Sequence, residues 1–413
     1  MKKILLVVNI LNLLGCCWLL VKLLFNYVGT PYILEYGGFY LFFVTWVVEF
    51  ILEKRWKRWQ WNYTTGYFIL LIVFFLLSII YAPFDSEVYF KHLLEKRYAL
   101  FGFGIVGLFG LNKYYKLSYC FNVMIITSIL TICYLVFFRI GFVPFITFPE
   151  RAILLANARI ASVNAHMGFN LYLNLSLIGI WYICTHSWHR LPHWKRYGYG
   201  AALLVIFYIL SQSEGRSGFL ASIVLMFSFI VLEIWKRRKI LGLLVVLLLP
   251  FILFAASSHH ARMSTDKLHS EPRLMLWHAA VEKIEDDKPV FGYGMSRAQE
   301  EFDKVNMKYI SEEYRHYWLS FKPYFIDTHN QYLQTFLEFG IIGLLLLLVL
   351  YTAPVFLVAP KRRILTVLIC GLCAYQSMFD MFITGQFCPL FCLLMLFLLK
   401  VKDDVQPRCE SGK

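Results

Sequence analysis

The sequence has few charged side chains for its length. Asp, Glu, Lys and Arg make up 16% of the 413 residues, whereas soluble domains usually contain about 25%. Hydrophobic residues make up 59%, which excludes an intrinsically disordered chain. The net charge of +14 would suit a nucleic-acid-binding protein only if the basic residues stood on a polar surface. The composition instead indicates a polytopic membrane protein, and we expect no nucleic-acid partner.

Cysteine is missing from the longest polar segment, residues 257–328, although the chain has 10 cysteines. All but one of them lie in apolar runs, which excludes a disulfide-stapled secreted scaffold. Cys370 with Cys373, and Cys388 with Cys392, have spacings that metal ligands also use. Their neighbours are Leu, Ile and Phe, with no polar groups to orient a ligand, so we expect these thiols to pack in the interior.

Twelve apolar runs are about long enough for a helix that crosses a bilayer, which takes about 20 residues. They lie at residues 4–25, 33–52, 66–84, 97–111, 119–138, 165–185, 198–212, 217–235, 239–256, 329–358, 362–382 and 386–400. The sequence therefore predicts an all-α polytopic membrane protein with about twelve transmembrane helices. The first run is too long for a cleaved signal peptide, and no small-residue cleavage site follows it.

Lys and Arg are unequally divided between the two sides of this arrangement. One side carries 22 of the 40, the short connections of the other side carry 8, and residues 257–328 carry 10. Because basic residues accumulate on the cytoplasmic side, the first side is predicted to be cytoplasmic and to hold both termini. The two halves of the chain differ in span and loop lengths, so the pattern does not support a transporter built from inverted repeats.

The spans divide the chain into four parts: transmembrane helices one to nine at 1–256, an outer loop at 257–328, transmembrane helices ten to twelve at 329–400, and a cytoplasmic tail at 401–413. The loop contains enough aromatic residues to pack. A helix is predicted from Glu271-Pro272 to about Asp287, because Pro suits the first turn of a helix. A turn at residues 291–294 and a second helix from about Ser296 to Met307 should follow.

Motifs for nucleotide or serine chemistry are absent. The sequence has no Walker loop, no Gly-x-Ser-x-Gly elbow and no dinucleotide fingerprint. The first outer connection has no Asp-x-Asp pair, and Glu35 is its one acidic residue. We therefore expect neither a cofactor nor a metal ion.

Arg216 is a basic residue on the outer side, where the rule that orients the chain disfavours it. It lies in a tight turn at residues 211–218 that opens a predicted helix. Gly215 and Gly218 would let a ligand approach the backbone closely, and the helix N-terminus would attract an anion. The alternative is an ion pair with Glu214 or with a lipid phosphate. We favour a functional role.

Arg273 and Trp277 lie four residues apart in the predicted loop helix and therefore share a face. The alternative to a functional role is an exposed arginine stacked on the indole ring.

His329 follows two residues, Asp327 and Thr328, that can each cap the next helix. In the first turn of that helix, the positive helix end would lower the pKa of His329 and keep it neutral. A neutral imidazole can act as a base. The alternative is a capping or interfacial histidine.

Four further residues lie on or near the outer side: Lys96, Arg97, Arg159 and His166. Together they would form a cationic patch for a polyanionic lipid headgroup. The alternative is that their side chains extend to the membrane interface without a specific ligand.

Three segments, in this order, resemble segments of the O-antigen ligase and polymerase superfamily. They are Ser213-Glu214-Gly215-Arg216-Ser217-Gly218; Arg273-x-x-x-Trp277-x-Ala279-Ala280 with Pro289-Val290-Phe291-Gly292-Tyr293-Gly294; and His329-Asn330-Gln331-Tyr332-Leu333 with Glu338-Phe339-Gly340-Ile341-Ile342-Gly343. The stretch from Arg159 to Asn170 is similar to a less specific part of the family. Glu214 stands where relatives often carry a small polar residue.

The resemblance implies a mostly helical membrane fold, similar to the C class of glycosyltransferases. It implies transfer of a glycan from undecaprenyl pyrophosphate to a lipid A–core sugar on the periplasmic face of the bacterial inner membrane. Arg216 and Arg273 would face the pyrophosphate, and His329 would be the catalytic histidine. Trp277 and Asn330 are predicted substrate contacts. We expect an inverting, metal-independent glycosyltransferase whose partners are the lipid-linked donor, the acceptor and membrane lipids.

Three alternatives remain open at the level of the sequence. An O-antigen polymerase would use another repeat unit as the acceptor, and a protein O-oligosaccharyltransferase would use a protein Ser or Thr. A transporter or flippase would need ionisable groups near the middle of the membrane. The acidic residues in the spans lie mostly near span ends, which disfavours transport; they are Glu49, Glu233, Glu338 and Asp380.

Overall fold

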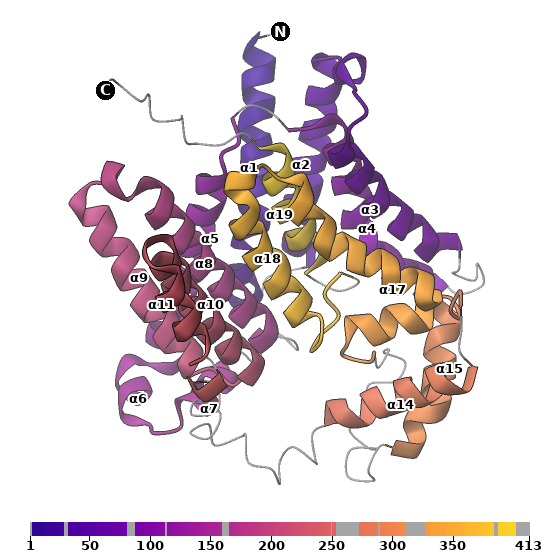
Figure 1. The fold of residues 1–413 in the computed structure, drawn as a ribbon. Helices are drawn as coiled ribbons and strands as arrows, with labels where there is room; N and C mark the ends of the chain where they lie inside the picture. Colours follow the sequence, from indigo (N-terminus) through magenta and orange to yellow (C-terminus); the bar gives the residue numbers. More distant parts are fainter. Residues whose placement is uncertain are drawn as a thin grey trace. The chain divides into compact units, whose positions relative to one another are not determined.

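The computed structural model describes most of the chain, and every structural statement below concerns this part. The described residues are 2–28, 32–80, 87–111, 114–158, 165–248, 250–252, 272–287, 290–309, 327–383 and 387–401. Within these ranges the regular structure is entirely helical (Figure 1). This confirms the all-α fold class predicted from the sequence.

Backbone contacts divide the chain into two compact units. The first unit comprises Met1–Glu53, Leu111–Ala261 and Lys400–Lys413, and the second comprises Lys54–Gly110 and Arg262–Leu399. The first contains α1 (Lys2–Val28), α2 (Tyr32–Leu52), α5 (Leu117–Cys133), η2 (Tyr134–Ile140), α6 (Phe142–Thr147), α7 (Arg151–Ala158), α8 (Ala165–Ser187), η3 (Trp188–Arg190), α9 (His193–Ser211), α10 (Arg216–Arg237) and α11 (Lys239–Val246). The second contains η1 (Arg55–Arg58), α3 (Tyr63–Ile80), α4 (Glu87–Phe109), α14 (Pro272–Asp287), α15 (Met295–Tyr309), α17 (Gln331–Leu357), η4 (Pro360–Arg362), α18 (Arg363–Gln376) and α19 (Cys388–Lys400).

Every apolar run predicted as a span overlaps a helix. Among the described residues, five helical stretches are long and apolar enough to cross a membrane: Lys3–Val21, Leu117–Ile140, Met167–Arg190, Arg216–Arg237 and Gln331–Leu357. Shorter apolar helices, such as Tyr63–Ile79 and Cys388–Lys400, accompany them. These helices are those of a membrane protein. The count of twelve spans stays a prediction.

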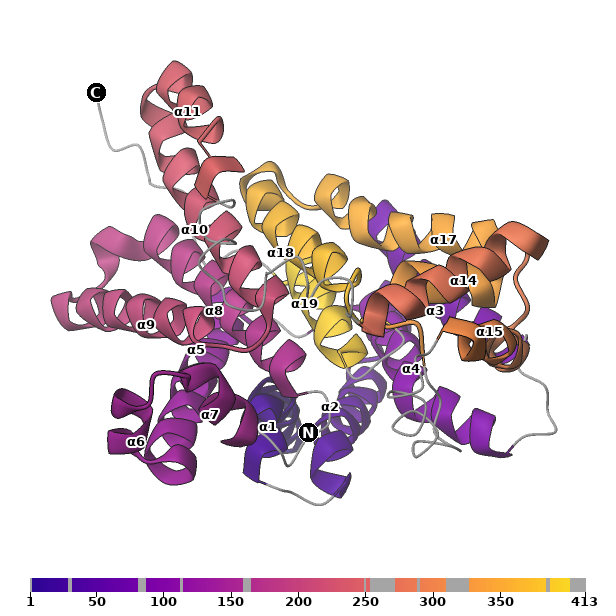
Figure 2. The same ribbon diagram turned by 90° about the horizontal axis from the view of Figure 1, so that it is seen from below.

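In the first unit, α8 packs against α5, α9 and α10 (Figure 2). Its residues from Met167 to Ile183 are buried. The approach to α5 is close because Gly179 has no side chain: a Cβ there would lie 2.7 Å from the ring of Phe121. The buried hydroxyls of Ser128 and Ser176 lie 2.9 Å apart and satisfy each other. α8 is therefore a central helix of this unit.

The second unit is organised around a break in α17. Gly340 has non-helical torsions, with φ 64° and ψ −158°. Just before the break, the carbonyl oxygens of Leu337 and Glu338 accept hydrogen bonds from the N–H groups of Tyr293 (2.8 Å) and Gly294 (2.9 Å). Two of the predicted family segments thus bind each other through their backbones.

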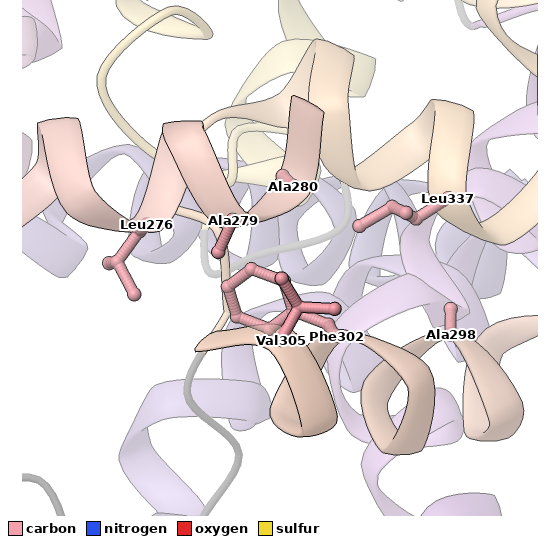
Figure 3. Close-up of a cluster of buried hydrophobic side chains, with 7 residues drawn as sticks. All are labelled: Leu276, Ala279, Ala280, Ala298, Phe302, Val305 and Leu337. Atoms are coloured by element: carbon pink, nitrogen blue, oxygen red, sulfur yellow. The ribbon is translucent and has the colours of Figure 1, made fainter. Parts of the chain in front are cut away.

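The two helices predicted in the long loop are confirmed as α14 and α15. They pack against each other and against the start of α17 (Figures 1 and 2). Figure 3 shows the buried cluster they share, with the ring of Phe302 between the two helices. Its members are Leu276, Ala279, Ala280, Ala298, Phe302, Val305 and Leu337. Because Leu337 belongs to α17, the loop helices and this membrane helix have one common core.

A buried ion pair lies in the same unit. The Nη2 atom of Arg97 in α4 donates to both carboxylate oxygens of Glu338, at 2.9 and 2.6 Å, and its Nη1 donates to Ser78 in α3 at 2.7 Å. The two charged side chains are 4% and 2% exposed. Burying either charge alone would be costly, so the pair is a strong mutual constraint on α4 and α17.

Replacing Gly292 by Ala should destabilise the protein. Its φ of +73° lies in the left-handed region, and a Cβ there would lie 2.4 Å from the carbonyl carbon of Glu338. The backbone conformation alone costs a residue with a Cβ about 1–2 kcal/mol. The melting temperature of the purified protein in detergent should therefore fall.

Gly371→Ala is the matched control, because no atom lies within 4 Å of a Cβ added at Gly371 in α18. Alanine there should stabilise the helix by about 0.5–1 kcal/mol. Equal melting temperatures for Gly292→Ala and the wild type would contradict the close contact between the two segments.

Removing one member of the Arg97–Glu338 pair should cost about 3–5 kcal/mol, because the other charge stays buried without a partner. We expect Arg97→Met and Glu338→Met each to lower the free energy of unfolding strongly. The double variant should cost much less than the sum of the two. Chemical unfolding in mixed micelles measures all three.

The control for this cycle is the exposed pair of Lys236 and Glu233, whose side chains are 53% and 48% exposed. Lys236→Met should cost at most about 1 kcal/mol. Additive losses in the Arg97 and Glu338 cycle would show that the two charges do not depend on each other.

Candidate active site

His329 lies in a tight turn that leads into α17. The carboxylate of Asp327 accepts a hydrogen bond from the backbone N–H of His329 (2.9 Å), and Thr328 Oγ1 donates to the carbonyl of Asn330 (2.8 Å). The side-chain oxygen of Asn330 accepts from the N–H groups of Tyr332 (3.0 Å) and Leu333 (3.1 Å). Asn330 is therefore the helix cap. The prediction that Asp327 or Thr328 caps this helix is wrong, because both are engaged within the preceding turn.

The backbone of His329 is left-handed, with φ 46°. Among the described residues, only His329 and Lys54 combine a side chain with a positive φ. This conformation persists only where the surroundings enforce it, and such residues cluster at functional sites. The imidazole is 30% exposed, so it remains within reach of a substrate.

Two carboxylates lie beside the imidazole. Nδ1 of His329 is 3.4 Å from Oδ1 of Asp327 and 3.9 Å from Oδ1 of Asp380. Burial lowers the pKa of His329, but the two negative charges outweigh it, and the net effect is a raised pKa. The predicted lowering is wrong, because His329 stands before the helix cap and faces these carboxylates. The imidazole is therefore a stronger base than an isolated one.

Asp380 reaches this position through contacts between the start of α17 and the segment that follows α18. The N–H of Gln331 donates to the carbonyl of Ser377 (2.8 Å), and the side-chain oxygen of Gln331 accepts from the N–H of Ile383 (2.9 Å). These bonds hold the segment around Asp380 against the His329 turn. In the sequence, Asp380 is only an acidic residue near a span end, because nothing local links it to His329.

The structure brings Arg273 and Trp277 to the same place. The positive charge of Arg273 is near enough to His329 to oppose the rise in its pKa. One turn later on α14, the ring of Trp277 lies 6.2 Å from that of Phe379, the neighbour of Asp380. This arrangement agrees with the prediction that Arg273 and Trp277 share a face. Arg273, His329 and the two carboxylates therefore form one cluster in the second unit.

Arg216 belongs to the first unit, where it is the first residue of α10 and is partly buried. The preceding turn is held by Asn170 of α8, whose side chain accepts from Ser213 Oγ (2.8 Å) and donates to the carbonyl of Gly215 (3.3 Å). A Cβ at Gly218 would lie 2.4 Å from the side chain of Asn170. Gly218 thus makes room for α8, whereas the sequence suggested room for a ligand.

The predicted cationic patch is only partly described. Arg159 lies outside the described residues, as do the side chains of Lys96 in α4 and His166 in α8. Arg97 is buried and paired with Glu338 and Ser78. This corrects the expectation of an outward-facing cation, because the charge of Arg97 is balanced within the protein.

The chemistry of the cluster is that of proton transfer beside an anion-binding group. A neutral imidazole can take a proton, and the carboxylates of Asp327 and Asp380 stabilise the imidazolium that results. The guanidinium of Arg273 offers several donors to a phosphate group. Among the described residues, no three His, Cys, Asp or Glu side chains are grouped so as to hold a metal ion.

Part of the chain is similar to known proteins. Residues 199–348 match the family model described as O-Antigen ligase. The chain is 30% identical over 155 residues to a "Putative polysaccharide ligase" of Rickettsia felis, and 28% identical over 156 residues to "Putative polysaccharide ligase RC0486" of Rickettsia conorii. Each match covers 36% of this chain and 36% of the relative, so the chain spans about a third of the length of these relatives.

The matched segment contains Arg216, Arg273 and His329, together with all three segments on which the resemblance was based. Asp380 lies beyond it. The resemblance to O-antigen ligases predicted from the sequence is therefore confirmed, and residues 199–348 carry it.

Proposed function

We propose that the protein is a glycan ligase. It transfers O-antigen glycan from undecaprenyl pyrophosphate to a sugar hydroxyl of lipid A–core, on the periplasmic face of the bacterial inner membrane. The observation that carries the proposal is the His329 imidazole beside Asp327, Asp380 and Arg273, in a chain that matches the ligase family. The names of the two relatives also favour a ligase over a polymerase.

The acceptor hydroxyl must lose a proton as its oxygen attacks the anomeric carbon. His329 takes that proton, and the carboxylates of Asp327 and Asp380 stabilise the charged imidazolium. One bond forms between the acceptor oxygen and the anomeric carbon, while the bond from that carbon to the pyrophosphate oxygen breaks. A single direct displacement inverts the configuration. General base catalysis of this kind contributes about 10²–10⁴-fold to the rate.

The leaving group is an undecaprenyl pyrophosphate whose negative charge grows as the bond breaks. Arg273, close to His329, donates hydrogen bonds to it, and charge-assisted bonds of this kind are about twice as strong as neutral ones. Arg216 is assigned the same role on the basis of its motif. In a site shielded from water, the stabilisation of developing charge usually contributes more to catalysis than any other effect. Neither a metal ion nor ATP is needed for this step.

The remaining assignments concern binding. The polyprenyl tail of the donor would lie along the apolar helices, since lipid-exposed apolar surface is what such a tail contacts. Trp277 and Asn330 flank the cluster and would contact the glycan or the acceptor. Both termini are assigned to the cytoplasm, following the distribution of basic residues.

Replacing Arg216, Arg273 or His329 by Ala should abolish long-chain lipopolysaccharide while the protein still reaches the membrane. Silver-stained gels of lipopolysaccharide and immunoblots of membrane fractions measure the two outcomes. Arg297→Ala and His278→Ala are matched controls, since both side chains are exposed on the loop helices α15 and α14; we expect normal ladders from both.

The pattern of loss identifies the acceptor. A ligase that fails leaves bare core, whereas a polymerase that fails leaves core capped with a single repeat unit. Normal lipopolysaccharide ladders from all three variants would contradict the proposed mechanism.

Asp380→Asn should shift the pH dependence of ligation. The carboxylate of Asp380 helps to raise the pKa of His329, so its neutralisation lowers that pKa. His329 must be neutral to act as a base, and its neutral fraction falls as the pH falls through its pKa. The acidic limb of kcat/KM against pH should therefore move to lower pH, and the maximal rate should drop because the base is weaker.

The assay uses purified protein, lipid-linked glycan and lipid A–core, with and without a chelator. Asp286→Asn, at the exposed end of α14, is the control. If the acidic limb of kcat/KM against pH does not move in Asp380→Asn, Asp380 has no part in the mechanism.

A further inference from the structure

We propose that Gln334 is a positioning residue for His329. Its side-chain amide holds the turn from Asp327 to Asn330 in the conformation that keeps the imidazole beside its two carboxylates. The inference rests on the proposed function, because positioning matters only if His329 is the base. It adds Gln334, one turn inside α17, to the residues on which the reaction depends.

The side-chain amide of Gln334 makes two hydrogen bonds, one as an acceptor and one as a donor. Its Oε1 accepts from the backbone N–H of Thr328 (3.3 Å), and its Nε2 donates to Oε1 of Glu338 (3.0 Å). A carboxylate can only accept, and a backbone N–H can only donate. The amide orientation is therefore fixed, and a neutral side chain with a donor and an acceptor is required at this position.

The bond to Thr328 acts on the peptide that joins Asp327 and Thr328, one residue before His329. Thr328 is completely buried, and its hydroxyl both donates to the carbonyl of Asn330 (2.8 Å) and accepts from its N–H (3.3 Å). The backbone is thus fixed on both sides of His329. The left-handed φ of His329 costs about 1–2 kcal/mol relative to a right-handed one. Without the hold on Thr328, the backbone would relax and carry the imidazole away from Asp327 and Asp380.

The other end of the amide is anchored in the membrane helices. Glu338 is fixed by Arg97, and Arg97 by Ser78. A continuous chain of hydrogen bonds therefore runs from α3 through α4 and α17 to the turn that carries His329. The buried Arg97–Glu338 pair thus helps to position His329 through Gln334.

The test compares Gln334→Met with Gln299→Met in the full-length protein in detergent. Methionine keeps the length of glutamine and removes both hydrogen bonds. Gln299 is a matched control: it is 6% exposed, like Gln334, and also donates to an acidic residue four positions later, Asp303 (2.9 Å). Gln299 lies in α15, and its hydrogen bond to Asp303 stays within that helix.

Two quantities are measured. The first is the pKa of His329, from the pH dependence of deuterium exchange at the imidazole carbon, followed by mass spectrometry of the peptide that contains it. The charged groups that set this pKa are Asp327, Asp380 and Arg273. We expect the pKa of His329 to fall in Gln334→Met and to stay unchanged in Gln299→Met.

The second quantity is the rate of ligation. A displacement of about 1 Å in a catalytic group can cost about 10²-fold, so kcat should fall about tenfold to a hundredfold in Gln334→Met. KM should change less than twofold, because Gln334 is buried and its amide bonds to groups of the protein itself. A purely structural role would lower the amount of folded protein but leave the pKa of His329 in place. An unchanged pKa of His329 in folded Gln334→Met overturns the proposal.

Gln334→Glu decides the question if Gln334→Met does not fold. When protonated, a glutamic acid side chain restores both bonds; when ionised, it repels Glu338. Its ligation rate relative to the wild type should be near one at low pH and should fall as the pH rises. A constant ratio overturns the proposal.

The two proposals fail in different ways. If the pKa of His329 falls in Gln334→Met but the wild type transfers no glycan, the positioning role is supported and the ligase function is wrong. If the wild type ligates and the pKa of His329 does not respond, only the positioning role fails.

Discussion

The backbone carbonyls of Leu337 and Glu338 need hydrogen-bond donors at the point where α17 breaks, and much of the second unit depends on this need. Buried backbone groups without partners are costly, above all in a membrane protein. The N–H groups of Tyr293 and Gly294 supply the donors. The same contact brings α14 against α17, and so Arg273 near His329. The break in α17 is therefore the point at which the segment between α14 and α15 binds and the site is assembled.

Local features of the sequence predicted the helices well. Pro272 marks the start of α14, and the glycine turn at 291–294 separates α14 from α15. Both signals lie within a few residues of these helix boundaries. The apolar runs located the remaining helices for the same reason. The capping residue of α17 was missed because Asp, Thr and Asn are all good caps, and the turn geometry alone selects Asn330.

The contacts that define the site could not be predicted from one sequence. Arg97 and Glu338 are 241 positions apart, and no pattern along the chain connects them. The pKa of His329 depends on Asp380, which reaches it only after α17 and α18 have packed. Predictions based on neighbours in the chain therefore singled out Arg273 and His329, but misjudged the direction of the pKa shift of His329 and the surroundings of Arg97.

The glycines of the family segments serve the packing of the protein. Gly218 leaves room for Asn170, and Gly292 leaves room for the backbone of Glu338. Glu338 is one of the acidic residues whose positions in the sequence disfavour transport. It is held by two hydrogen bonds to Arg97, and an ion pair fixed in this way suits a rigid scaffold better than a moving carrier.

The break at Gly340 also gives α17 a short first segment with an electrostatic character of its own. Residues 331–339 form a piece roughly 13 Å long at 1.5 Å per residue, with a partial positive charge at its start and a partial negative charge at its end. Asp327 and Asp380 gather near the positive end, and Arg97 lies near the negative end, where it offsets both the helix and Glu338. The segment is a small dipole matched by counter-charges at both ends. The positive end of the segment therefore favours the negative charges of the two carboxylates beside His329.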